Sequence, residues 1–191
     1  MSNSARNVTV GKPKVGGAVS VGATTLTMPN DATSELAPGF TGLGYCSEDG
    51  ATNQTSRESE KIKAWGGDTV ASPQTSFEDT FKFTLIETLN VDVLKEVYGT
   101  SHVKGTLETG ITVDVNSEEL SARAWVIDTV ATDNALKRMV IPYGKITNIG
   151  EISYKDNQAV GYEVTITATP DGNGNTHYEY IKRATADVSN S

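Results

Sequence analysis

The chain has 191 residues, of which 37% are hydrophobic, so it can bury one sizeable core and is not a structureless protein. Its 24 acidic and 16 basic residues give a net charge of -8, whose field repels nucleic acids and anionic lipid surfaces. The single cysteine, Cys46, cannot form an internal disulfide, so the fold depends on its core.

The chain begins with a polar N-terminal arm, residues 1–14. The mildly apolar residues 15–23 that follow are diluted by glycine and serine, so they do not form a secretory signal. No apolar run reaches the ~18 residues of a membrane-spanning helix. We therefore expect a soluble product of the cytoplasm without a membrane partner.

Residues 47–76 form a second polar stretch, which is too long for an ordinary internal loop. Such a stretch is either a disordered linker or a segment that a partner orders. Residues 61–65 alternate like a strand and end in Trp65, and Gly66 and Gly67 follow. Because an isolated Trp in a polar segment favours a pocket, we expect a long assembly loop that becomes ordered against another subunit.

The strongest strand pattern lies in residues 75–86, preceded by a weaker one in residues 42–46. The strong pattern places one apolar face towards the core, and Asp79 interrupts that face, which indicates a bulge or a sheet edge. The apolar face consists of Phe77, Phe81, Phe83 and Leu85.

One helix is expected over residues 91–98. Asn90 can cap its start, and Gly99 can end it. Val93, Leu94 and Val97 share the face that would pack on the sheet. The residues left for solvent or for a neighbouring subunit are Asp92, Lys95 and Glu96.

The second half of the chain contains mostly strand patterns. Turn residues at 155–157 and 170–174 predict two hairpins, and residues 133–137 predict one helical turn. The expected fold is therefore mainly β: a single domain over residues 1–191 that forms an antiparallel β-sandwich or barrel with one flanking α-helix and long assembly arms. The expected strands are residues 110–115, 122–129, 137–142, 145–154, 162–168 and 177–182.

The residues offer little for catalysis. His102 and His177 lack metal-ligand spacing and are expected at the surface or in turns, and Cys46 is expected as a small buried residue. Residues 171–175 resemble the start of a calcium loop, but the required glycine and glutamate are missing, so a turn is expected. We expect no enzyme, cofactor or metal site.

The order of segments resembles the major tail tube proteins of long-tailed (siphovirus) bacteriophages. The resemblance covers about residues 42–181, and its specificity comes from order and spacing. The first half contributes KAWGGDTV (63–70), FKFTLIET (81–88) and NVDVLKEVYG (90–99). The second half contributes RMVIP (138–142), GEISY (150–154) and GYEVTITATPDG (161–172).

The resemblance implies a fold related to type VI secretion tubes, in which homo-hexameric rings stack into a hollow conduit for DNA within the virion tail. Subunits would be made in the host bacterial cytoplasm and would also meet tape measure and tail terminator proteins. DNA would pass through the lumen without specific binding, as the acidic balance favours. The expected interface residues are Ile62, Trp65, Gly66, Gly67, Asp68, Val70, Asp92, Lys95 and Glu96.

A carbohydrate-binding or adhesin-type β-sandwich of a phage tail or cell surface is the alternative. That function requires clustered exposed aromatic side chains, whereas aromatic residues make up only 7% of this chain and several lie on a strand's apolar face.

Overall fold

The computed structural model describes residues 3, 7–14 and 17–183. The expected polar N-terminal arm therefore lies partly outside the described residues. Across the described ranges the fold is mainly β, with antiparallel sheets and one α-helix, as the sequence predicts.

Nine strands form the main sheet, and all their pairings are antiparallel. Its path runs through β3 (Thr41–Gly42), β2 (Val19–Gly22), β10 (Arg123–Val130), β11 (Ala135–Ile149), β12 (Tyr162–Ala168), β7 (Gln74–Leu85) and β4 (Cys46–Ser59). Beside this path, β1 (Lys12–Pro13) pairs with β10, and β13 (Tyr178–Arg183) pairs with β11. Two small sheets consist of β5 (Ile62–Lys63) with β6 (Thr69–Ala71), and β8 (Val103–Lys104) with β9 (Thr112–Val113).

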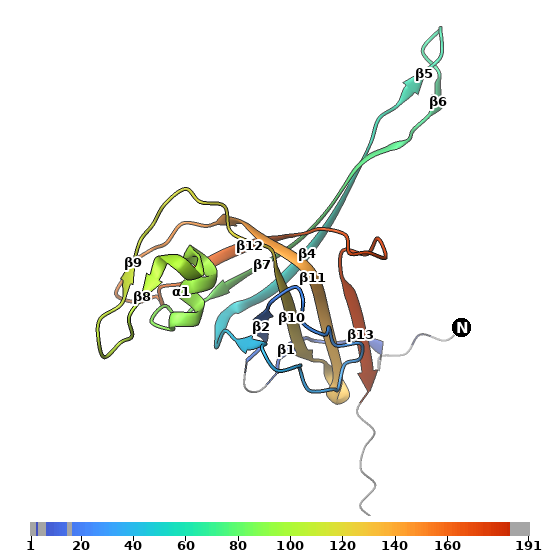
Figure 1. Ribbon diagram of the computed structural model, residues 1–191. Helices are drawn as coiled ribbons and strands as arrows, with labels where there is room; N and C mark the ends of the chain where they lie inside the picture. Colours follow the sequence, from blue (N-terminus) through green and yellow to red (C-terminus); the bar gives the residue numbers. More distant parts are fainter. Residues whose placement is uncertain (1–2, 4–6, 15–16, 184–191) are drawn as a thin grey trace, which may run out of the picture.

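The core lies between one face of the main sheet and α1 (Val91–Tyr98), which Figure 1 shows against the body. Asn90 accepts a hydrogen bond from the backbone N–H of Asp92, and the N–H of Gly99 bonds to the carbonyl of Lys95, so the helix begins and ends as predicted. Its buried residues, also as predicted, are Val93, Leu94 and Val97. They share one apolar cluster with sheet residues that include Phe81, Phe83, Leu85, Trp125, Ile141 and Ile166.

The longest strand, β11, replaces two expected strands and has two partners on one edge. Its residues 135–140 pair with β13, and its residues 144–149 pair with β12. Because β13 continues along this edge in the direction of β12, the hairpin predicted at residues 170–174 is wrong. Its turn residues form a loop between two consecutive strands instead. Pro142 lies in the short stretch between the two sets of pairs, where a missing N–H is tolerated.

Other elements depart from the sequence pattern in detail. The strand expected at residues 110–115 is only Thr112–Val113, and the strand expected at 145–154 ends at Ile149. The helical turn expected at 133–137 is a 3-10 turn, Thr132–Asn134. The chain around residues 42–46 ends β3 and begins β4.

Candidate assembly surface

A long β-hairpin extends away from the body, and Figure 1 shows it leaving the sheet where β4 and β7 end their contact with the core. We call residues 56–78 the hairpin arm. Residues 57–78 are all exposed, on both faces of the hairpin. The expected loop at 47–76 is therefore paired strand over much of its length, and its backbone hydrogen bonds are made within the chain.

The tip of the hairpin arm presents its apolar side chains to solvent. Trp65 is 107% exposed, Ile62 is 51% exposed and Val70 is 64% exposed. Gly66 and Gly67 have φ values of 111° and 98°, which glycine adopts without strain, so they form the turn. The N–H of Ala64 bonds to the carbonyl of Asp68 at 2.8 Å and closes it. The tip residues expected at an interface thus gather on one protruding turn.

Cross-strand contacts stabilise the middle of the hairpin arm. The guanidinium of Arg57 lies over the ring of Phe77, 4.5 Å from its centroid, and also donates to Gln74 at 3.1 Å. Ser76 donates to Glu58 at 3.2 Å. Phe77 is 37% exposed, so the prediction that it belongs to the core wall is wrong. The apolar face of β7 is buried at Phe81, Phe83 and Leu85, because the strand enters the body only after Phe77.

The helix residues expected at an interface lie on the body, away from the hairpin arm in Figure 1. The side chains of Asp92 and Lys95 are 52% and 35% exposed and form an ion pair at 3.8 Å. Glu96 differs from the expectation, because its carboxylate accepts two hydrogen bonds from Arg123, at 2.9 and 3.1 Å, and its side chain is only 10% exposed. Burial raises the pKa of the Glu96 carboxyl, and the nearby Arg123 opposes that rise. Glu96 is therefore occupied within its own chain.

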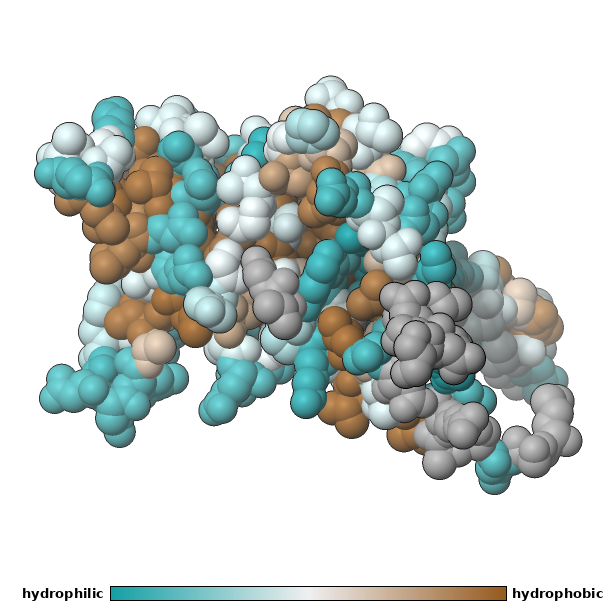
Figure 2. Space-filling model, turned by 90° about the horizontal axis from the view of Figure 1, so that it is seen from below, coloured by the Kyte–Doolittle hydropathy of each residue, from teal (hydrophilic) through white to brown (hydrophobic). Residues whose placement is uncertain are grey.

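A groove of about 710 Å³ lies at the start of β4, at the other end of that strand from the tip. Its apolar lining includes Pro13, Val19, Ile127 and Met139, and residues 44–51 form one wall. Figure 2 views the side of the body away from the hairpin arm, and there apolar patches alternate with hydrophilic ones. The two ends of the molecule thus carry different surfaces, a protruding apolar tip and a grooved, mixed face.

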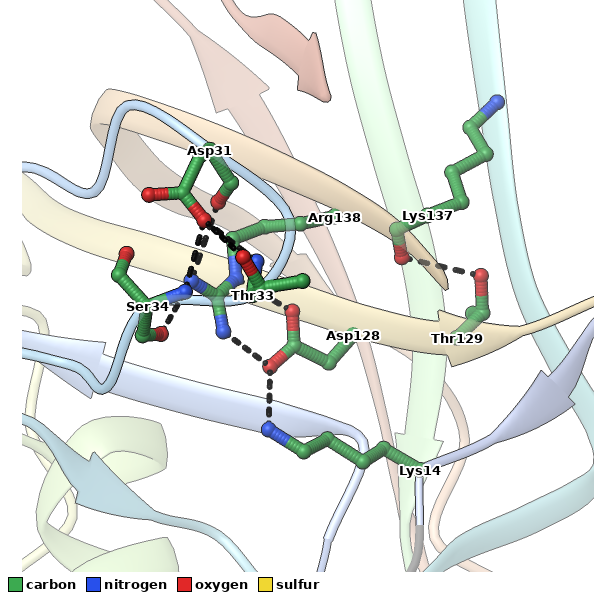
Figure 3. A network of polar contacts seen from close by, with 8 residues as sticks. All are labelled: Lys14, Asp31, Thr33, Ser34, Asp128, Thr129, Lys137 and Arg138. Carbon is green, nitrogen blue, oxygen red and sulfur yellow. Dashed lines mark hydrogen bonds and ion pairs between the residues drawn. The ribbon is translucent and has the colours of Figure 1, made fainter. Parts of the chain in front are cut away.

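A polar network beneath residues 31–34 attaches this segment to the sheet (Figure 3). The guanidinium of Arg138, 1% exposed, donates to both carboxylate oxygens of Asp128 at 2.7 and 2.9 Å. It also donates to the carbonyls of Asp31 and Ser34 at 3.2 and 2.8 Å. Backbone donors from Thr33 and Ser34 lower the pKa of the Asp31 carboxyl. The sequence pattern treated Arg138 as part of a strand and did not reveal this role.

The residues considered for catalysis or metal binding form hydrogen bonds within the fold. Asp171 accepts hydrogen bonds from the backbone N–H groups of Asn173 and Asn175, as expected of a turn. His102 bonds to Glu118 at 2.8 Å, and His177, which lies in the loop before β13, bonds to the buried Asp79. In the described part of the chain no cluster of metal-ligating side chains is found. Nor does any described helix have the length and apolarity to cross a membrane.

A family model described as "Phage tail tube protein" matches residues 6–190, which is nearly the whole chain. A search of curated proteins found no match. The match spans the sheet, the helix and the hairpin arm together, and the family is structural. The chain therefore belongs to the phage tail tube protein family, a component of the virion tail.

Proposed function

We propose that this protein is the tail tube subunit of a siphovirus, and that six copies close into a ring and rings stack into the hollow conduit through which the genome is delivered. The observation that carries the proposal is the hairpin arm, a paired but otherwise uncovered structure that ends in a completely exposed Trp65. Within one chain the described residues around it provide no apolar surface for that tip. A second copy of the chain is the partner that best accounts for it.

Burial of the tip against a second copy would favour assembly. A large aromatic side chain buries ~150 Å² or more, and at ~25 cal/mol per Å² this amounts to roughly 4 kcal/mol for Trp65 before ordering costs. Ile62 and Val70 would add to it. Because the hairpin is already paired, less backbone entropy is lost on binding than for a disordered loop.

The placement of the tip favours head-to-tail assembly. Strand β4 has 14 residues and therefore spans ~45 Å, with the groove at its start and the tip beyond its end. A contact between two different surfaces is heterologous, so it can close around a ring or propagate along a stack. We propose that both occur, with the hairpin arm reaching a neighbouring copy and with tape measure and terminator proteins at the ends of the tube.

The acidic balance suits a conduit for DNA. A net charge of -8 disfavours capture of phosphates, so we propose that DNA passes through the lumen without specific binding. Salt-sensitive binding of duplex DNA at micromolar protein would contradict this part of the proposal.

The test is to shorten the hairpin arm. Because Ser56 and Glu78 are register partners, residues 57–77 can be replaced by an Asn-Gly turn that closes the hairpin behind that pair. We expect a chain that melts cooperatively but forms no tubes in negative-stain electron microscopy, while Trp65→Ala weakens assembly and Trp65→Phe largely restores it. Tubes of normal diameter and yield from the shortened chain would refute the proposal.

A further inference from the structure

A buried carboxylate lies at the root of the hairpin arm. Asp79 is 0% exposed, whereas the five residues that precede it on β7 are all exposed. It lies on the face of β7 that continues into the core through Phe81 and Phe83. Asp79 therefore marks the position at which the hairpin leaves the body.

Donors from two other segments of the chain converge on this carboxylate. Asn53 on β4 donates to Oδ1 at 2.8 Å. Thr176 and His177, from the loop before β13, donate to Oδ2 at 2.6 and 2.5 Å. Since a carboxylate only accepts hydrogen bonds, Nδ1 of His177 carries the proton in this contact. The His177 ring also packs edge-on against Phe81, with centroids 5.1 Å apart.

The loop that supplies two of these donors is itself ordered. The carboxylate of Asp171 accepts hydrogen bonds from the N–H groups of Asn173 and Asn175 at 2.8 and 3.0 Å. Tyr178, the first residue of β13, donates its hydroxyl to Asp171 at 2.6 Å. The donors that face Asp79 are thus attached to the body.

We propose that Asp79 is a positioning residue that fixes the direction in which the hairpin arm leaves the body. A buried carboxylate is costly without hydrogen bonds, so it is stable only in the geometry that satisfies its donors. An apolar residue at this position would continue the face made by Phe81 and Phe83, but it would pack in several orientations. The hydrogen bonds of Asp79 provide less apolar burial than such a residue would, but they select one orientation of the hairpin arm.

The length of the hairpin amplifies any freedom at its root. Asp79 lies eight positions along the chain from Ala71, the register partner of Ile62 near the tip, and at ~3.4 Å per residue this lever is about 27 Å long. An angular freedom of about 10° at Asp79 therefore moves the tip by about 5 Å. The contacts are all within one chain, so the inference can be tested without assembly and does not depend on the proposed function.

The test measures the distance from tip to body in a monomeric fraction. Lys63 at the tip and Asp92 on α1 are replaced by spin-labelled cysteine in a Cys46→Ala background, and pulsed electron paramagnetic resonance gives the distance distribution. In Asp79→Leu we expect a distribution about two-fold wider, or a mean shifted by about 5 Å. Thr176→Val, which removes one donor at constant shape, should give a smaller change in the same direction.

The matched control is Glu78→Leu, at the exposed neighbouring position of β7. It should leave the distribution unchanged. Circular dichroism and cooperative melting show whether the Asp79→Leu chain is folded. If it is folded and its distance distribution is unchanged, the inference is overturned, and the twist of the strands directs the hairpin arm instead. If Asp79→Leu does not fold, Thr176→Val decides, and an unchanged distribution there has the same consequence.

Discussion

Arg138→Met should cost about 3 kcal/mol of unfolding free energy. Arg138 makes four hydrogen bonds, two to the carboxylate of Asp128 and two to the backbone carbonyls of Asp31 and Ser34. Methionine fills the space of the aliphatic stem but makes none of these bonds. The variant therefore leaves one carboxylate and two carbonyls without their main donor.

The magnitude follows from the burial of the pair. Removal of one partner from a buried ion pair costs about 3 to 5 kcal/mol. The low end applies because the side chain of Asp128 is 13% exposed and is also 3.4 Å from Lys14. Arg138→Lys keeps the charge but loses the two-pronged contact, so we expect a loss of about 2 kcal/mol.

Urea unfolding followed by Trp fluorescence measures this loss. Trp125 is 0% exposed and reports on the core, and a Trp65→Phe background removes the exposed fluorophore. The control is Lys137→Met, next to Arg138 on β11, whose ion pair with Glu179 is more than a third exposed on both sides. We expect the control to lose less than about 1 kcal/mol. A loss below about 1 kcal/mol in Arg138→Met, with an unchanged denaturant slope, would refute the assigned role.

Three further results are expected. Phe83→Ala should cost about 3 to 5 kcal/mol, because Phe83 is 2% exposed, whereas Phe77→Ala should cost about 1 kcal/mol or less in thermal melts, and equal costs would contradict the register of β7. Asn90→Ala should cost about 1 kcal/mol through loss of the helix cap, and Asn90→Ser, which keeps a capping oxygen without adding a charge beside Glu87, should restore most of it in the same melts. Burial, with a smaller contribution from Glu87, raises the pKa of the Cys46 thiol from 9.0 to about 11. At pH 8 iodoacetamide should therefore alkylate the folded chain about 100-fold more slowly than an ordinary thiol, and mass spectrometry showing rapid modification there would contradict the raised pKa.

The elements that the sequence predicts well are those whose signals are local. The helix begins after Asn90 and ends before Gly99, as its caps indicate. Strand β12 has the bounds of its alternating pattern, Tyr162–Ala168, because one of its faces is buried along the whole strand. Local capping and a strict two-residue period determine these elements without help from the rest of the chain.

Apart from the strand patterns at residues 61–65 and 75–78, the hairpin arm could not be predicted as strand, because neither of its faces is buried. Without a buried face there is no two-residue period in hydrophobicity, and the polar composition resembles that of a loop. What the sequence did indicate was the exception within it, Trp65 followed by Gly66 and Gly67, and these residues form the tip. The position of the turn and short parts of the strands beside it were therefore predictable, while the pairing of the two long strands was not.

The buried contacts of Asp79 could not be predicted from the sequence either. The strand pattern identified it as a polar residue on an apolar face and suggested a bulge or an edge. The structure instead provides its partners Thr176 and His177, which lie about a hundred positions later in the sequence. A single sequence contains no local signal that connects them. The hydrogen-bond partners of a polar residue on an apolar strand face are therefore known only from the structure.

The body and the hairpin arm depend on different interactions, so substitutions in the two parts should have different effects. The body is stabilised by an apolar core and by buried networks such as that of Arg138, so its variants should change folding first. The hairpin arm has a paired backbone and no buried side chain, so substitutions at Trp65 should leave the unfolding free energy of one chain nearly unchanged. Asp79 lies between the two, because it is buried with the body but determines where the arm points. Variants there should alter the geometry of the arm in a chain that still folds, an effect that neither a core residue nor a tip residue would produce.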